Sequence, residues 1–308
     1  MGTSLKPQAE PRRLPEPQAG ERQAAVDLCP HRPPSAHMLD STAPLETMQR
    51  SRGEAHVVLG PRGLIDLAQA GSAKAMLPRM TAGLPEIVFL NTSGGLASGD
   101  RLGFGVELRP DARALATTQT AERAYRATGA PATAEVDLTV GAGAWLDWLP
   151  QETILYDGAR LHRETTVDLA EDAGCLLLEM LVLGRLAMGE RPARLDLRDR
   201  RVVRRGGRVI HHDALALDHD ALARLPGAAM TGGAPALATL ALIAPHAPDL
   251  LPAARAVLDE PGVEAAASAP PGRLVIRLLA ADGWPLRRQI NRLLRVLRPH
   301  PLPRIWQV

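Results

Sequence analysis

The expected fold follows from one stretch, LGFGVEL at residues 102–108. Its apolar side chains occupy every second position, which is the period of a strand with one buried face. Residues 134–140 alternate in the same way, and residues 160–169 alternate more loosely. Gly, Pro and Asp separate these runs, so the sequence indicates many short strands at close spacing, as in a sandwich, a barrel or a β-helix. There is no strict sequence repeat that would choose among the three.

The strand pattern extends over residues 46–217, and the texture becomes mixed in residues 218–308. In this second part, residues 237–243 and 274–280 are predicted strands, and residues 249–258 are a predicted short helix. The pattern therefore predicts a β-rich part followed by a mixed α/β part.

The clearest helix is predicted near the C-terminus. Pro285 suits its first turn, and Pro299 ends it. Its apolar positions form one stripe along the helix, Leu286, Ile290, Leu293, Leu294 and Leu297. The other face carries arginines, which we interpret as a solvated face. Residues 302–306 are predicted to form an extended strand or tail.

Composition narrows the class of protein. The 308 residues are 45% apolar, which is enough for a sizeable core. The 36 Lys and Arg nearly balance the 34 Asp and Glu, which argues against a nucleic-acid binder. With no secretory signal and no stretch of membrane-spanning length, we expect a cytoplasmic protein without a membrane partner. Residues 1–45 are predicted to be a disordered Pro-rich extension, and Cys175 a small buried thiol.

The strongest local signal is the glycine-rich stretch NTSGGLASGD at residues 91–100. A phosphate-binding loop is the first idea. However, the stretch lacks a Gly-Lys-Ser/Thr ending, and the residues after it look like a strand rather than a helix. We therefore interpret it as a turn that needs positive φ, in which Asp100 bonds nearby backbone groups.

Two other chemistries are weighed from the residues alone. A β-rich carbohydrate-active enzyme would need two carboxylates across a sugar site, and five acidic side chains are available, Glu152, Asp157, Glu164, Glu179 and Glu190. Trp145 and Trp148 are expected to face opposite sides of a strand, which weakens an aromatic platform. Three His and three Asp within residues 211–220 suggest a metal cluster. Neighbouring strand residues diverge, so solvated turn residues remain the default there.

Five short motifs occur in order along the chain: NTSGG with GDRL (91–102), TTQTAERAYR (117–126), WLPQETI (148–154), LGR with GE (183–190), and LR with PRIW (297–306). Together they resemble the UreD family of urease accessory proteins, also called UreH. The resemblance covers roughly residues 46–308. Ser98 stands where the family more often has Gly.

This resemblance implies a mainly β fold of helicoidal stacked sheets, similar to a β-helix, with a few helices. It implies a non-enzymatic scaffold that is required for nickel incorporation into apo-urease. Family members bind UreF, which recruits the GTPase UreG, and UreE is the usual nickel donor. No tightly bound cofactor is expected, and Ni(II) passes transiently through a polar interior. The C-terminal helix and the tail through Trp306 are candidate surfaces for partners.

We expect Glu152 and Glu190, together with Asp100, to line this passage. Buried carboxylates are costly unless they serve a cation or a partner, and nickel accepts carboxylate ligands. The alternative is that Glu152 and Glu190 bond strand ends and pair with Arg185 or Arg126. A further hypothesis is purely architectural: the protein only bridges UreF and urease, and the metal travels elsewhere.

Overall fold

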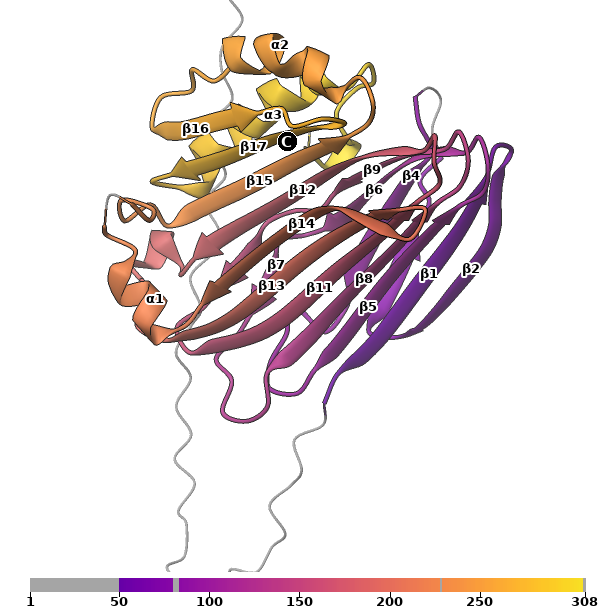
Figure 1. The fold of residues 1–308 in the computed structure, drawn as a ribbon. Helices are drawn as coiled ribbons and strands as arrows, with labels where there is room; N and C mark the ends of the chain where they lie inside the picture. Colours follow the sequence, from indigo (N-terminus) through magenta and orange to yellow (C-terminus); the bar gives the residue numbers. More distant parts are fainter. Residues whose placement is uncertain (1–49, 80–82, 228, 307–308) are drawn as a thin grey trace, which may run out of the picture. The chain divides into compact units, whose positions relative to one another are not determined.

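The computed structural model describes residues 50–79, 83–227 and 229–306. The predicted extension, residues 1–45, lies outside the described residues. The described residues fall in one compact unit, Met48–Val308, which is built on two facing β-sheets (Figure 1). Among these residues, no helix is both long enough and apolar enough to cross a membrane.

The sheet in front in Figure 1 has seven strands. Its five central strands pair in parallel, and an antiparallel strand closes each edge. In spatial order the strands are β14 (Arg208–Leu217), β13 (Leu195–Arg205), β11 (Ala159–Leu169), β8 (Ala132–Val140), β5 (Arg101–Leu108), β1 (Arg52–Gly60) and β2 (Gly63–Gly71).

The sheet behind it has ten strands, of which eight follow one path. They are β16 (Val263–Ser268), β17 (Arg273–Ala280), β15 (Ala236–Ile243), β12 (Gly174–Leu183), β9 (Trp145–Leu149), β6 (Arg113–Gln119), β4 (Glu86–Asn91) and β3 (Ala73–Met76). The short strands β7 (Glu122–Ala124) and β10 (Thr153–Leu155) lie off this path.

The chain alternates between the two sheets as it winds. It runs from β4 to β5, from β6 to β8, from β9 to β11 and from β12 to β13, and each new strand pairs in parallel with the strand of the preceding turn. The result is a solenoid-like stack of about four turns. The predicted helicoidal stacking of sheets is therefore confirmed. The five strands expected from the sequence are observed as β5, β8, β11, β15 and β17.

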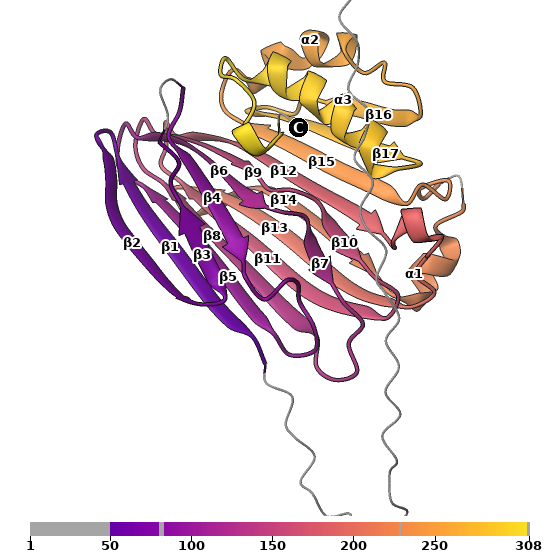
Figure 2. The ribbon, with the colours of Figure 1, turned by 180° about the vertical axis from the view of Figure 1, so that it is seen from behind.

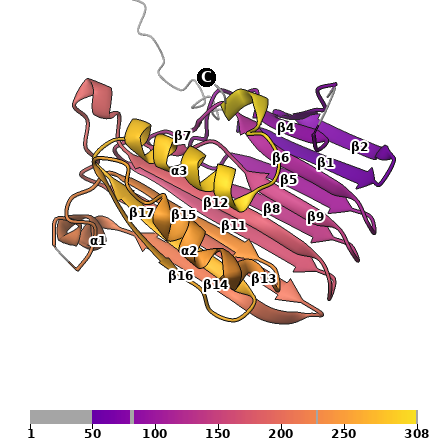
Figure 3. The same ribbon diagram turned by 90° about the horizontal axis from the view of Figure 1, so that it is seen from above.

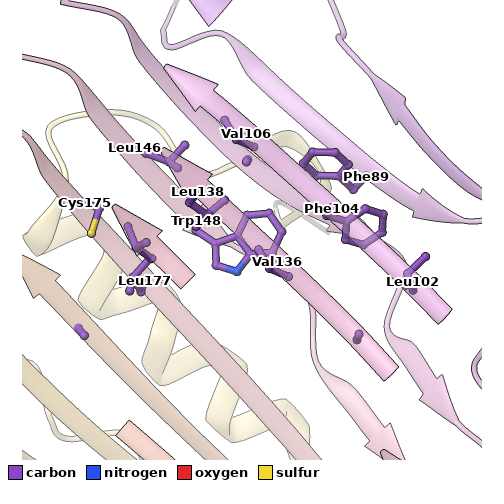
Figure 4. Packing of buried hydrophobic residues seen from close by; sticks show 14 of the residues in the cluster. Phe89, Leu102, Phe104, Val106, Val136, Leu138, Leu146, Trp148, Cys175 and Leu177 are labelled. Carbon is purple, nitrogen blue, oxygen red and sulfur yellow. The ribbon is translucent and has the colours of Figure 1, made fainter. Parts of the chain in front are cut away.

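Apolar side chains fill the space between the sheets. Phe89 lies with its ring centroid 4.7 Å from that of Phe104 and 6.0 Å from that of Trp148 (Figure 4). β12 is buried along its whole length because its odd-numbered residues face the other sheet while its even-numbered residues pack under the helices. This two-sided burial explains why β12 reads as a continuous apolar run.

Helices cover the outer face of the ten-stranded sheet (Figures 2 and 3). The predicted C-terminal helix is confirmed as α3 (Gly283–Leu297), and its whole apolar stripe is buried. The Asp282 side chain caps it by accepting a hydrogen bond from the Trp284 N–H. The shorter helical segments are α1 (His219–Arg224), α2 (Leu251–Ala256), η1 (Leu186–Met188), η2 (Ala247–Leu250) and η3 (Arg304–Trp306).

The C-terminal tail differs from its prediction. An extended segment was expected over residues 302–306, but the chain forms η3, and Trp306 is only 1% exposed. The indole N–H of Trp306 donates to Thr117 Oγ1 and to the Leu149 carbonyl, both at 3.3 Å. Of the two expectations, an extended strand or a tail, the strand is wrong, because a local sequence pattern carries no information about these distant hydrogen-bond acceptors. Trp306 is consequently part of the fold rather than an exposed anchor.

The arginine face of the C-terminal helix is also less solvated than expected. Arg298, just after α3, is 5% exposed, and its Nε lies 2.5 Å from Asp147 Oδ2 on β9. Further ion pairs join Arg287 to Glu152, Arg288 to Glu260, and Arg292 to both Asp259 and Glu260. These arginines form ion pairs between the helix and the sheet or the loops that connect its strands.

Candidate functional site

The glycine-rich stretch between β4 and β5 is a turn, as the sequence predicts. Gly94 and Gly95 have φ angles of 81° and 149°, which favour glycine. A Cβ on Gly95 would also lie 2.3 Å from the Tyr125 ring. Asp100 Oδ1 accepts from the Ser51 N–H and Oδ2 from the Ala97 N–H, both at 2.8 Å. The role of Asp100 visible here is to hold this turn against the start of β1.

Glu190 is bound at the surface end of its loop. Arg185 Nε donates to Glu190 Oε2 at 2.7 Å, and Glu190 Oε1 accepts from the Asp157 N–H at 3.1 Å. The hydrogen bond from Arg185 lowers the pKa of Glu190. The alternative expectation for Glu190, a pair with Arg185, is thus observed.

Glu152 is held from another direction. Its Oε2 lies 3.5 Å from Nη1 of Arg287 on α3, rather than near Arg185 or Arg126. Arg126 instead pairs with Asp157. The three predicted passage residues therefore sit at separate places, each with protein donors or cations as neighbours. None of them is among the residues that line the cavities described next.

A cavity of about 90 Å³ lies between the two sheets. One part of its wall is aromatic and is formed by Phe89, Phe104 and Trp148 (Figure 4). The other part is polar and includes Glu122 and Glu179. A mixed wall of this kind is typical of a binding site rather than of a packing defect, which would be lined by apolar groups alone.

Glu179 is a charged residue in an otherwise apolar row of β12. Its side chain points between the sheets because its neighbours in the row, Leu177 and Leu181, do so. The residue is 4% exposed. Burial raises the pKa of Glu179 to about 7, against the opposing charge of Arg163.

Glu122 faces the same cavity from β7. It accepts a hydrogen bond from Asn91 Nδ2, 3.2 Å from Glu122 Oε2, and another from the Arg123 N–H. Burial raises the pKa of Glu122, and the bond from Asn91 opposes the rise. Glu122 has no ion pair with a side chain in the described part of the chain.

A network of alternating charges runs from Glu179 across the interior. Arg163 on β11 contacts Glu179 through Nη1, 2.6 Å from Oε1, and Asp199 through Nη2, 2.9 Å from Oδ2. From Asp199 on β13 the network continues outward to Arg201, Asp213 and Arg277, with nitrogen–oxygen distances of 3.6, 3.2 and 2.9 Å in turn. We call these six residues the ion-pair network. It ends at Arg277, whose side chain is 60% exposed.

Buried charges in this network stabilise one another. Burial alone would lower the pKa of Arg163, but the charges of Asp199 and Glu179 raise it above its ordinary value. Arg163 and Arg201 in turn lower the pKa of Asp199, although burial acts in the opposite direction. The network holds three carboxylates and three guanidinium groups, so every charge in it is matched. Removing Arg163 would leave the buried carboxylate of Glu179 without an ion pair, which is strongly unfavourable.

A second cavity, of about 340 Å³, lies on the far side of the network. Its wall includes Glu179, Arg201 and Arg277 along with apolar residues of β14 and β15. Glu179 therefore belongs to the walls of both cavities. The ion-pair network stands between the two spaces.

Three buried polar atoms at the first cavity lack a hydrogen-bond partner in the described structure. They are Nε2 of Gln151, Oγ1 of Thr165 and Oε1 of Glu179, on residues that are 6%, 2% and 4% exposed, and Glu179 Oε1 has only the ion pair with Arg163. Buried polar atoms in native proteins are nearly always satisfied, by water or a ligand where the protein offers nothing. These three atoms are available to hydrogen-bond water or a polar ligand in the cavity.

The histidine and aspartate cluster at residues 211–220 does not converge. His211 and Asp213 point inward from β14, His212 points outward, and α1 begins at His219 in place of the expected turn. Across residues 50–79, 83–227 and 229–306, no group of three His, Cys, Asp or Glu side chains is arranged to hold a metal ion.

The carboxylates considered for sugar cleavage are each engaged by an arginine. The pairs are Glu152–Arg287, Asp157–Arg126, Glu164–Arg200, Glu179–Arg163 and Glu190–Arg185. Trp145 and Trp148 face opposite sides of β9 as predicted, and Trp148 packs in the core between the sheets. No arrangement of these residues favours glycoside hydrolysis.

Sequence reasoning missed most of the interior charges. Arg163 lies in a predicted strand, on the same side as Leu161 and Val167. The alternation of the strand therefore predicts that the Arg163 side chain points into the core. Glu179 likewise interrupts an apolar run. A charged residue at an inward position of a strand is the signal that would have found both.

These observations define a class: a solenoid-like β-scaffold that encloses matched charges and two cavities between its sheets. Residues 51–307 match the family model described as UreD urease accessory protein. The chain is 73% identical over 274 residues to the urease accessory protein UreD of Paracoccus denitrificans (strain Pd 1222), covering 89% of this chain and 98% of the relative.

Two further relatives carry the same name. The protein of Cereibacter sphaeroides (strain ATCC 17025 / ATH 2.4.3) is 58% identical over 270 residues, with coverage of 86% and 98%. That of Methylobacterium sp. (strain 4-46) is 44% identical over 272 residues, with coverage of 84% and 96%. The chain belongs to the UreD family of urease accessory proteins.

Proposed function

We propose that this protein is an accessory factor for urease maturation, required for nickel incorporation into apo-urease and without catalysis of its own. Family membership supports the accessory role. The structural observation that carries the metal-handling part is Glu179, because this residue lines two cavities and its carboxylate offers a cation a binding position between them. We place this activity in the cytoplasm.

The proposal includes an assembly in which the chain connects UreF to apo-urease. UreG joins through UreF, and UreE supplies nickel indirectly. The glycine-rich stretch supports assigning GTP hydrolysis to UreG rather than to this chain, because here it is a turn closed by Asp100. Neither a nucleic acid nor a membrane is part of the proposed assembly.

Nickel in transit needs several weak binding positions, because a tight cage would trap it. Glu122 and Glu179 supply two such positions inside the protein. Asp100, Glu152 and Glu190 remain proposed positions along the rest of the route. A passing cation there would compete with the present donors, such as Arg185 at Glu190 and Arg287 at Glu152.

The test is the nickel content of urease purified from cells that carry the urease genes and a variant of this chain. We expect E122Q/E179Q to reduce nickel per urease strongly and E152Q/E190Q to reduce it less. The control is E54Q/E264Q, which makes the same chemical change at two exposed carboxylates. Full nickel content in cells that lack the chain would overturn the accessory role itself.

The architectural alternative predicts a different pattern. Ala134→Leu narrows the first cavity, which Ala134 lines, and leaves the exposed surfaces unchanged. If this variant and E122Q/E179Q both bind partners and urease reaches full nickel content, the passage is rejected and the chain acts only as a bridge.

A further inference from the structure

The position of Arg163 marks a place that suits a divalent cation. Its guanidinium group lies between two buried carboxylates: it forms an ion pair with Glu179 on one sheet and donates hydrogen bonds to both oxygens of Asp199 on the other. Its Nη1 also donates to Thr153 Oγ1 at 3.0 Å. Two carboxylates and a hydroxyl from three strands thus converge on one positive charge. Hard oxygen donors of this kind also bind divalent metal ions.

The surroundings differ from those of an ordinary buried ion pair. Cavities adjoin this point on both sides, and Thr165 Oγ1, which is buried and unpartnered, lines the first cavity together with Arg163 and Glu179. Water can therefore complete a coordination shell there, which two carboxylates alone cannot do. No group of three His, Cys, Asp or Glu side chains converges here in the described structure, so the proposed site has two carboxylate ligands.

An alternative carboxylate partner for Arg163 is present in the first cavity. Glu122 lines the same cavity as Arg163 and has no ion pair of its own in the described structure. A guanidinium group that left Glu179 and Asp199 could therefore pair with Glu122 without becoming an isolated buried charge.

We propose that Glu179 and Asp199 form a divalent-cation site that Arg163 occupies at rest as a tethered cation, and that Arg163 moves to Glu122 when a metal ion takes its place. Arg163 thus closes the connection between the two cavities until a divalent ion displaces it. The inference relies on the proposed function only for the identity of the cargo, Ni(II).

The experiment measures Ni²⁺ bound by the purified full chain in equilibrium dialysis, with no urease present. We expect Arg163→Gln to bind one more Ni²⁺ per chain than the unmodified protein. In R163Q/E179Q and R163Q/D199N we expect this extra ion to be lost. The matched control is Arg298→Gln, which breaks a buried pair with the single carboxylate of Asp147 and should add no ion.

Folding of each variant is checked by circular dichroism before dialysis. If Arg163→Gln does not fold, Arg163→Lys decides, because it keeps the positive charge but loses the two-pronged contact with Asp199. Tighter Ni²⁺ binding by the folded variant than by the unmodified protein supports the site, and equal binding overturns it. An extra ion in R163Q together with full urease nickel content in E122Q/E179Q would retain the site while rejecting the passage.

Discussion

The two halves of the interior are built on the same winding but contain different chemistry. Between β1, β5, β8 and their partners β4, β6 and β9, the space is packed with apolar side chains such as Phe89 and Phe104. Between β11, β13, β14 and β12 lie five of the six residues of the ion-pair network, and the first cavity spans the boundary between the two halves. The winding can therefore be stabilised by the first half, which leaves the second free to carry polar groups that do not improve packing.

The largest effect is expected in the apolar half. Trp148→Ala should lower the free energy of unfolding by about 3–5 kcal/mol, because it leaves a void among closely packed rings. Urea denaturation followed by circular dichroism measures this. Trp145→Ala, on the opposite face of β9 and only partly buried, should cost clearly less. Equal losses of unfolding free energy for the two variants would contradict the conclusion that the Trp148 face of β9 is the more closely packed one.

A second comparison sets the ion-pair network against the buried Arg298–Asp147 pair at the end of α3. Asp147→Asn should cost about 3–5 kcal/mol, because it leaves Arg298 buried and unpaired. Glu179→Gln should cost only about 1 kcal/mol, because Arg163 keeps its two bonds to Asp199 and a buried charge is removed. Both are measured by urea denaturation at neutral pH. The reverse order would show that Glu179 serves stability first.

The exposed end of the network should matter little. Arg277→Ala is expected to cost less than about 1 kcal/mol, because its guanidinium group is largely in water. The loss should shrink further when salt is added, since salt screens exposed pairs. Denaturation at low and high ionic strength tests this, with Arg198→Ala, another exposed arginine, as the control. A cost that salt leaves unchanged would mean that the Arg277–Asp213 pair is shielded from solvent.

The smallest expected change concerns thiol chemistry and should leave stability almost unaltered. In a Cys29→Ser background, Cys175 should resist a small alkylating reagent, because it is fully buried and burial raises its pKa. A cysteine introduced by Thr165→Cys lines the first cavity and should react faster. Mass spectrometry over time compares the two rates. Equal protection would mean that solvent does not reach the cavity.

Sequence reasoning reached the strand content, the C-terminal helix and the glycine-rich turn. These features depend on neighbours in the chain, as in the alternation along β5 or the stripe of α3. The winding was available only through the family resemblance, because its parallel pairs join residues such as Leu102 and Ala134, which share no repeated motif.

The candidate site was harder to predict. Glu152 and Glu190 stand out as members of motifs, but the structure gives each an arginine neighbour away from the cavities. Arg163 and Glu179 meet only because β11 and β12 face each other from different sheets. A contact of this kind depends on the register of the whole stack, which no local pattern contains.

The buried position of Trp306 has a consequence for synthesis on the ribosome. Its indole bonds Thr117, which is translated 189 residues earlier. At about 5–20 residues per second, roughly 10–40 s separate the two, so the leucine-rich back of β9 and β12 emerges long before the helix and tail that shield it. During that interval the nascent polypeptide exposes an apolar surface that its helix does not yet cover. A cell that makes this protein needs to prevent aggregation through that surface.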